Sequence, residues 1–205
     1  MEKWYQVKKV FFGSKDVKTY SFKNNSDKIS HGDYALLVNT KIRSKTPKKK
    51  TDKSVQNLIK KLNLTTTPTF ISLTNTLNTK EGYCFQNCEQ YVKTHGGKAI
   101  YGWMIWEDKK AKFIEAEFHA VIKKNGQYID ITPRIDNDEK ILFVEDNTRN
   151  SGRMKEHSDS WYSWSNFKII NNKILQEAIA EQVKELPNDK NDIFPKCIHL
   201  KIKGK

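Results

Sequence analysis

The chain has 205 residues and a formal net charge of +13, and 37% of its residues are hydrophobic. This length suits a single domain with a proper core, and no apolar run is long enough to cross a bilayer. The N-terminal stretch MEKWYQVKKVFFGSK has neither the apolar segment nor the cleavage site of a signal peptide, and an odd number of cysteines, three, argues against a disulfide framework. We therefore expect an intracellular, cytoplasmic protein that is not embedded in a membrane and keeps its thiols reduced.

Residues 1–50 are predicted to form a β-rich N-terminal extension of this single domain, which spans residues 1–205. Short apolar runs alternate there with polar turns and indicate three strands, WYQVKKVFF, VKTYSF and DYALLVN. Pro47 then breaks the pattern, which predicts a loop after the third strand.

A strongly basic run covers residues 41–61, with nine basic residues, one acidic residue and a net charge of +8. Lys48, Lys49 and Lys50 are adjacent within it and are candidates for contact with nucleic acid or another acidic partner. The run has almost no arginine and no aromatic residue, both of which favour nucleic-acid recognition. The favoured interpretation is a solvated loop with weak affinity for polyanions.

Two amphipathic helices are predicted outside the region that carries the chemistry. The first lies at the end of the basic run, where apolar residues have helical spacing at Val55, Leu58, Ile59 and Leu62. The second is a C-terminal helix over residues 170–186, before Pro187, with one apolar side formed by Ile174, Leu175, Ala178, Ile179 and Val183.

The stretch EGYCFQNCEQYVKTHGG, residues 81–97, predicts a short helix that starts at Gly82 and stops at Gly96-Gly97. Cys84 falls in its first turn, where free backbone N–H groups and the helix dipole favour a thiolate. A thiolate paired with an imidazolium is an activated acyl-transfer nucleophile, and its own N–H is suited to stabilise an oxyanion. Cys84 is therefore a candidate nucleophile.

Cys88 lies one turn further along, on the apolar stripe with Phe85 and Val92, and is interpreted as a small buried hydrophobe. A zinc site formed by Cys84, Cys88 and His119 would lack a fourth ligand. A disulfide between two cysteines one turn apart on a helix has poor geometry. We therefore expect neither a metal nor another cofactor.

The stretch EFHAVIKKNGQYIDITP, residues 117–133, predicts a β-hairpin within an antiparallel meander of strands. Asn125-Gly126 is the signature of a two-residue type I′ turn, which pairs Lys124 with Gln127 and His119 with Thr132. Because side chains alternate along a strand, two faces follow. The first carries His119, Val121, Tyr128, Asp130 and Thr132. The second is apolar and is assigned to the core: Phe118, Ala120, Ile122, Ile129 and Ile131.

His119 and Asp130 take diagonal positions across this hairpin, where Cβ atoms lie about 7 Å apart. The carboxylate can then hydrogen-bond the imidazole, fix its tautomer and stabilise its protonated form. The structural alternative is a satisfied His-Asp pair on a half-exposed sheet face. The presence of a candidate nucleophile, Cys84, favours catalysis over that alternative.

The chain resembles the transglutaminase-like branch of the papain-like cysteine enzymes in the order of four elements. These are Cys84, His119-Ala120, the Asn125-Gly126 turn and Asp130-Ile131-Thr132-Pro133. The longer string CFQN, GWMIWE, EAEFHAVI, DITP and ILFVED is also similar to small bacterial and phage-type proteins of this class. The resemblance covers residues 82–146, about a third of the chain.

The resemblance implies an α+β fold of the papain-like or transglutaminase-like type, with a nucleophile helix packed on an antiparallel sheet and residues 82–146 as the catalytic core. It also implies a Cys84-His119-Asp130 triad acting on a protein or peptide substrate as a cysteine peptidase, an amidase or deamidase, or a transglutaminase. Asn78 and Trp103 are candidates for a second oxyanion donor. The alternative is a non-catalytic binding module of the same fold that docks through the lysine-rich run.

Overall fold

The structure is a computed structural model that describes residues 4–10, 17–23, 44–134, 138–187 and 193–202. It is mostly antiparallel sheet, with two helices among the described residues, in agreement with the predicted α+β class. The main sheet, which has seven strands, runs from edge to edge as β11 (Lys173–Gln176), β10 (Phe167–Ile170), β5 (Phe113–Lys124), β4 (Lys98–Asp108), β7 (Lys140–Glu145) and β3 (Thr69–Ser72), with β6 (Gln127–Ile129) paired to β5.

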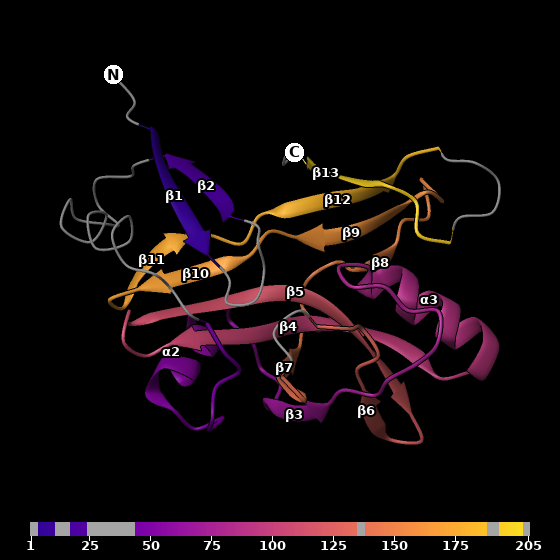
Figure 1. The fold of residues 1–205 in the computed structure, drawn as a ribbon, viewed down its shortest axis with the longest axis horizontal. Coiled ribbons are helices and arrows are strands. Elements are labelled where there is room, and N and C mark those ends of the chain that lie inside the picture. Colours follow the sequence, from indigo (N-terminus) through magenta and orange to yellow (C-terminus); the bar gives the residue numbers. More distant parts are fainter. Residues whose placement is uncertain (1–3, 11–16, 24–43, 135–137, 188–192, 203–205) are drawn as a thin grey trace.

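A second sheet lies above the main sheet in the view of Figure 1. Its strands have the order β13 (Cys197–Lys201), β12 (Ala180–Glu185), β9 (Ser160–Trp164) and β8 (Gly152–Arg153). Near the N-terminus, β1 (Trp4–Val10) pairs with β2 (Val17–Lys23), which confirms two of the three strands predicted there. The third predicted strand lies outside the described residues. None of the helices in the described part of the chain is long and apolar enough to cross a membrane.

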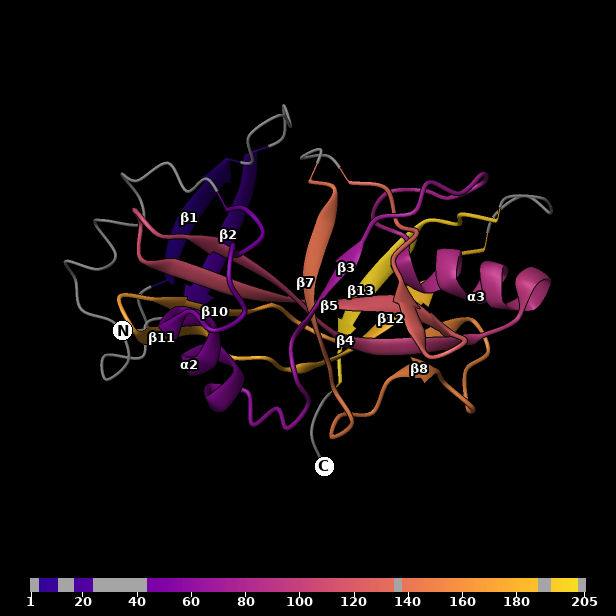
Figure 2. The same cartoon turned by 90° about the horizontal axis from the view of Figure 1, so that it is seen from below.

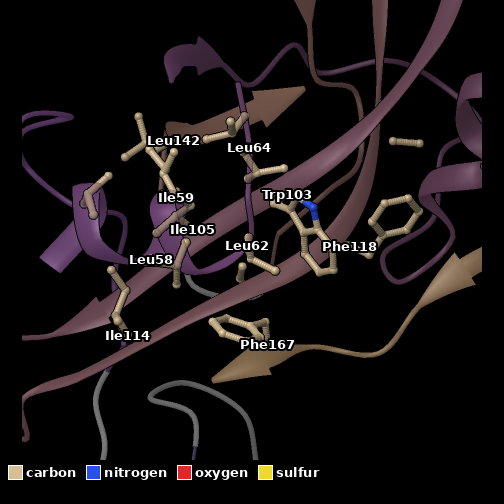
Figure 3. Packing of buried hydrophobic residues seen from close by; sticks show 14 of the residues in the cluster. Leu58, Ile59, Leu62, Leu64, Trp103, Ile105, Ile114, Phe118, Leu142 and Phe167 are labelled. Carbon is tan, nitrogen blue, oxygen red and sulfur yellow. The ribbon is translucent and has the colours of Figure 1, made fainter. Parts of the chain in front are cut away.

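The helices α2 (Lys53–Lys61) and α3 (Cys84–His95) pack at opposite ends of the long β4–β5 pair, as Figures 1 and 2 both show. The predicted helix at the end of the basic run is confirmed as α2. Its buried side chains enter a core that also takes in both sheets and α3. Figure 3 shows the α2 end of this core, where helix and sheet residues interdigitate: Leu58, Ile59, Leu62, Leu64, Trp103, Ile105, Ile114, Phe118, Leu142 and Phe167.

The predicted C-terminal helix over residues 170–186 is wrong, because this segment forms β11 and β12. Asn171 and Asn172 both have positive φ, 46° and 66°, and make a two-residue turn that pairs Ile170 with Lys173. After that hairpin the chain crosses to the second sheet, where β12 pairs with β9 and β13. Long-range pairing thus overrides the helical spacing of the apolar residues.

The predicted meander is also wrong in its last step. β4, β5 and β6 follow one another as neighbours, but β7 returns to the opposite edge of β4 and pairs there, with Trp103 opposite Val144. β4 is therefore a central strand, and the β4–β5 pair forms the middle of the main sheet.

Candidate active site

The helix α3 begins at Cys84, two residues after the predicted start at Gly82, and ends before Gly96, whose φ of 73° suits a glycine stop, so the predicted end is confirmed. Its hydrogen-bond series opens with the N–H of Asn87 donating to the C=O of Tyr83 at 2.9 Å. The N–H of Cys84 comes before that first helical bond and is one of the orphan donors of the helix start. The half-buried Cys84 thiol therefore lies beside a backbone donor suited to an oxyanion.

Cys88 is buried at 1% exposure in the main core, as predicted, and all three cysteines are free. Burial, followed by the nearby charges of Cys84 and Asp130, raises the pKa of Cys88 well above its usual value. The two cysteines one turn apart thus have different environments, and Cys88 is held as a neutral thiol.

The hairpin has the predicted register next to its turn, from Lys124–Gln127 to Ile122–Ile129, but the predicted pairing of His119 with Thr132 is wrong because the chain leaves β5 beyond Ile129. Lys124 pairs with Gln127 across the Asn125-Gly126 turn, whose φ values of 51° and 78° fit a type I′ turn. The two faces also separate as predicted. One enters the main core with Phe118, Ala120, Ile122, Ile129 and Ile131, and the other meets a smaller apolar cluster through Val121 and Tyr128.

His119 lies where the pairing of β5 changes partner. One edge of β5 pairs with β10 over residues 113–116 and with β6 over residues 122–124. Beyond Ile129 the chain leaves β5, and Asp130 instead forms a parallel bridge with Leu73. His119 therefore sits between two paired segments, beside the diverging strand that delivers the aspartate.

The His119 and Asp130 side chains form a buried pair, with His119 Nε2 3.2 Å from Asp130 Oδ2. Their exposed fractions are 5% and 1%. The other carboxylate oxygen, Oδ1, accepts a hydrogen bond from the N–H of Thr132 at 3.0 Å. Because Asp130 engages Nε2, we infer that Nδ1 is the imidazole nitrogen available to Cys84.

The electrostatics of the pair favour an imidazolium. Burial alone lowers the pKa of His119, but the charges of Asp130 and Cys84, together with side-chain hydrogen bonds to both, hold that pKa well above its usual value of 6.5. The structure thus places Cys84 at the start of α3, His119 on β5 and Asp130 on the segment after β6, and it shows the predicted pairing of His119 with Asp130.

Gly102 on β4 lies opposite His119 on one side and opposite Glu145 of β7 on the other. A Cβ atom at this position would lie 2.1 Å from the carbonyl oxygen of Val144 and 2.8 Å from Cζ of Phe143. This close approach of β7 to β4 needs a residue without a side chain and fixes the sheet beside His119.

The two candidates for a second oxyanion donor, Trp103 and Asn78, lie in different surroundings. Trp103 is fully buried in the main core, and its indole N–H donates to Asp146 Oδ2 at 2.7 Å. This engaged donor does not favour Trp103 as an oxyanion donor. Asn78 lies in an exposed turn with a φ of 60°, six residues before Cys84, and its role stays a prediction.

The adjacent lysines Lys48, Lys49 and Lys50 are exposed and immediately precede α2. The carbonyls of Lys49 and Lys50 accept hydrogen bonds from the N–H of Asp52 and the side-chain amide of Gln56, so their backbone supports the helix start. Since α2 and α3 lie at opposite ends of the β4–β5 pair, this segment is remote from Cys84 (Figure 2).

One polar residue near the site, Asn87, was not singled out from the sequence, and Thr132 was placed only on the hairpin face of His119 and Asp130. Asn87 is a buried amide one turn after Cys84, and Thr132 follows Asp130 by two residues; the two side chains are hydrogen-bonded to each other at 3.2 Å. The signal for Asn87 was a polar residue three positions after a candidate nucleophile, on the same side of a helix. No group of three or more His, Cys, Asp or Glu side chains in the described ranges is arranged to hold a metal ion.

The arrangement has the three parts that nucleophilic catalysis needs: a half-buried thiol at a helix start, an imidazole that interacts with it, and a carboxylate that holds the imidazole. In comparisons with protein-family models, curated proteins and solved structures, nothing matches this chain.

Proposed function

We propose that the chain is a thiol-dependent acyl-transfer enzyme or amide hydrolase, in which Cys84 is the nucleophile, His119 transfers protons and Asp130 orients His119. The observation that carries this proposal is the buried His119–Asp130 pair, 3.2 Å between Nε2 and Oδ2, which interacts electrostatically with Cys84 at the first position of a helix. A structural His-Asp pair needs no thiol beside it.

The first half-reaction forms a thioester. The Cys84 thiolate attacks an amide carbonyl carbon, the new C–S bond pushes the carbonyl electrons onto oxygen, and the Cys84 N–H stabilises that oxyanion. When the intermediate collapses, the C–N bond breaks and the His119 imidazolium gives its proton to the departing amine.

The second half-reaction releases the acyl group. Water or an amine loses a proton to His119 and attacks the thioester, and the C–S bond breaks to restore the Cys84 thiolate. Attack by water gives peptidase, amidase or deamidase activity, and attack by an amine gives transglutaminase activity. Protein or peptide amides are the proposed substrates.

We also propose that the fold is of the transglutaminase-like or papain-like type. Support comes from the order of the parts: α3 begins with Cys84, β5 carries His119, and Asp130 directly follows β6, the second strand of the Asn125-Gly126 hairpin. The second sheet and the β7–β4 pairing surround this unit without supplying any of its three side chains.

The experiment that tests the function is alkylation of the purified protein with limiting iodoacetamide across a pH series, with mass spectrometry to locate the labelled cysteine. An ordinary thiol has a pKa of about 8.5 and is almost unreactive near pH 6. Cys84 should react there at least about tenfold faster in the wild type than in His119→Ala, because the imidazolium that stabilises the thiolate is gone. Asp130→Asn should give an intermediate rate, and Cys88 should stay unlabelled until the protein unfolds.

A second measurement separates an enzyme from a binding module. With p-nitrophenyl acetate, an acyl-transfer enzyme should release a burst of p-nitrophenol and leave an acetyl group on Cys84. Rapid alkylation of Cys84 without acyl-enzyme formation would favour the binding module, and labelling that ignores His119→Ala would rule out the nucleophile assignment.

A further inference from the structure

We propose that Asn87 is a positioning residue that holds the aspartate side of the site against the nucleophile helix, an inference that rests on the proposed function. Asn87 lies one turn after Cys84 on α3, and its side chain is 2% exposed. A buried amide on a helix face is costly unless it is fully hydrogen-bonded.

The Asn87 amide makes hydrogen bonds to two segments of the chain. Its Oδ1 accepts from the N–H of Lys80 at 3.0 Å, and its Nδ2 donates to the C=O of Lys80 at 2.8 Å. The second hydrogen of Nδ2 serves the hydroxyl of Thr132, at 3.2 Å. This pattern requires two donors and one acceptor on one planar group, which an asparagine supplies and an aspartate does not.

One of these segments leads to the acid. Thr132 accepts from Asn87 through its hydroxyl and donates its own N–H to Asp130 Oδ1 at 3.0 Å, while Asp130 Oδ2 pairs with His119. Asn87 therefore acts on the orientation of Asp130 through Thr132, and on His119 through Asp130.

The other segment leads to the nucleophile. The carbonyl of Lys80 also accepts a hydrogen bond from the N–H of Tyr83 at 3.3 Å, which closes the turn just before Cys84. Asn87 therefore binds the same carbonyl oxygen that closes this turn. One side chain thus ties the turn before Cys84 to the strand end that carries Asp130. The site depends on this link because Asp130 is no longer paired with β5, the strand that carries His119, and instead forms a bridge with Leu73.

The test compares three variants by their Cys84 alkylation profile and their Tm. Asn87→Leu is close in size and removes every hydrogen bond of the amide, whereas Thr132→Val removes the hydroxyl and keeps the N–H that binds Asp130. The control is Gln86→Leu, since Gln86 is the neighbouring buried amide on α3 and bonds Cys197 and Glu185, outside the triad.

Asn87→Leu and Thr132→Val should each slow the alkylation of Cys84 near pH 6 about tenfold, because the imidazole beside the thiol is no longer held in place. The double variant should be no slower than Asn87→Leu alone, because both changes break the same link. Gln86→Leu should lower Tm and leave the alkylation rate of Cys84 unchanged. A purely structural role for Asn87 would lower Tm in the same way without changing that rate.

The outcomes distinguish the two proposals. If wild-type Cys84 alkylates like an ordinary thiol, or is indifferent to His119→Ala, the proposed function fails and the role of Asn87 fails with it. If the wild type and His119→Ala behave as expected but Asn87→Leu and Thr132→Val keep the wild-type alkylation rate of Cys84, the role of Asn87 alone is overturned. Should Asn87→Leu not fold, Thr132→Val decides by the same loss of rate.

Discussion

The two helices that cover the main sheet bury different kinds of side chain. The buried residues of α2 are Val55, Leu58 and Ile59, all aliphatic, whereas those of α3 are Phe85, Gln86, Asn87 and Cys88. Burying an amide gains little stability even when it is hydrogen-bonded, while burying a leucine contributes about 1.5–3 kcal/mol. Burial of apolar side chains therefore stabilises the α2 end more than the α3 end, where two of the four buried helix residues are polar.

This difference has a spatial counterpart. The helices lie at opposite ends of the β4–β5 pair, so stability and the proposed chemistry draw on separate regions of one sheet (Figures 1 and 2). Substitutions in α2 should mainly change the free energy of unfolding, and substitutions at the start of α3 should mainly change the reaction. The predictions below test this separation.

The largest expected effect is on the reaction. Cys84→Ala should lower the rate of acyl transfer to an amine or to water at least about 1,000-fold, because a triad without its nucleophile keeps only binding and oxyanion stabilisation. The free energy of unfolding should change by less than about 1 kcal/mol, since the residue is half-buried and small. Burst kinetics with p-nitrophenyl acetate and urea denaturation measure the two effects; a large loss of stability would contradict the separation.

The converse change is in α2. Leu58→Ala should lower the free energy of unfolding by about 3 kcal/mol, because Leu58 is fully buried in the main core (Figure 3) and truncation leaves a cavity. The alkylation profile of Cys84, measured well below the transition temperature, should match that of the wild type. A shifted profile would mean that the two ends of the sheet are coupled.

Asp146 allows the same comparison to be tested through the pH dependence of stability, because its hydrogen-bond network reaches the end of α2. Burial raises the pKa of Asp146, but hydrogen bonds from the Trp103 indole, from Thr148 and from Arg149 outweigh it and hold the pKa below its usual value of 3.8. Arg149 in turn donates to the C=O of Leu62, at the C-terminal end of α2. The carboxylate therefore ties β7 to the helix.

A group whose pKa is lowered by folding contributes stability above its unfolded pKa and loses it as the pH falls through the folded value. Asp146→Asn should thus cost about 2 kcal/mol of unfolding free energy at neutral pH, and this difference should narrow as the pH falls below 3.8. Urea titrations at neutral pH and near pH 3 measure it. Asp159→Asn, an exposed acid paired with Lys184, is the control and should have little effect.

The smallest effect is expected in the basic segment before α2. Replacing Lys48, Lys49 and Lys50 with Gln should leave folding and acyl transfer nearly unchanged, because these side chains are exposed and remote from Cys84. Binding to heparin or nucleic acid should weaken, and that loss should disappear as salt is raised. A loss of activity that salt does not affect would place this segment in the site.

The parts of the site that could be predicted from the sequence depend on local rules. The Asn125-Gly126 turn fixes the register of the hairpin, and with it the shared face of His119 and Asp130. The position of Cys84 follows from the glycine that ends its helix and from the apolar stripe behind it. Each of these signals acts within about twenty residues, where backbone geometry decides the outcome.

The failures all involve distant partners. The apolar spacing of residues 170–186 fits a helix, but the Asn171-Asn172 turn and pairing with β5, β9 and β13 make it strands. The place of β7 beside β4 is equally non-local. Asn87 was recognisable only as a polar residue on a buried stripe, and its partners, Lys80 and Thr132, become visible in three dimensions.

The contact at Gly102 also sets the mutational tolerance of the sheet. The carbonyl of Val144 occupies the space that any side chain would need, and His119 is the neighbour across the other edge of the strand. Even alanine would have to push β7 away from β4, with no flexible side chain able to give way, and the displacement would reach the strand that holds the imidazole. A saturation library at this position, selected for folded protein, should therefore return glycine alone.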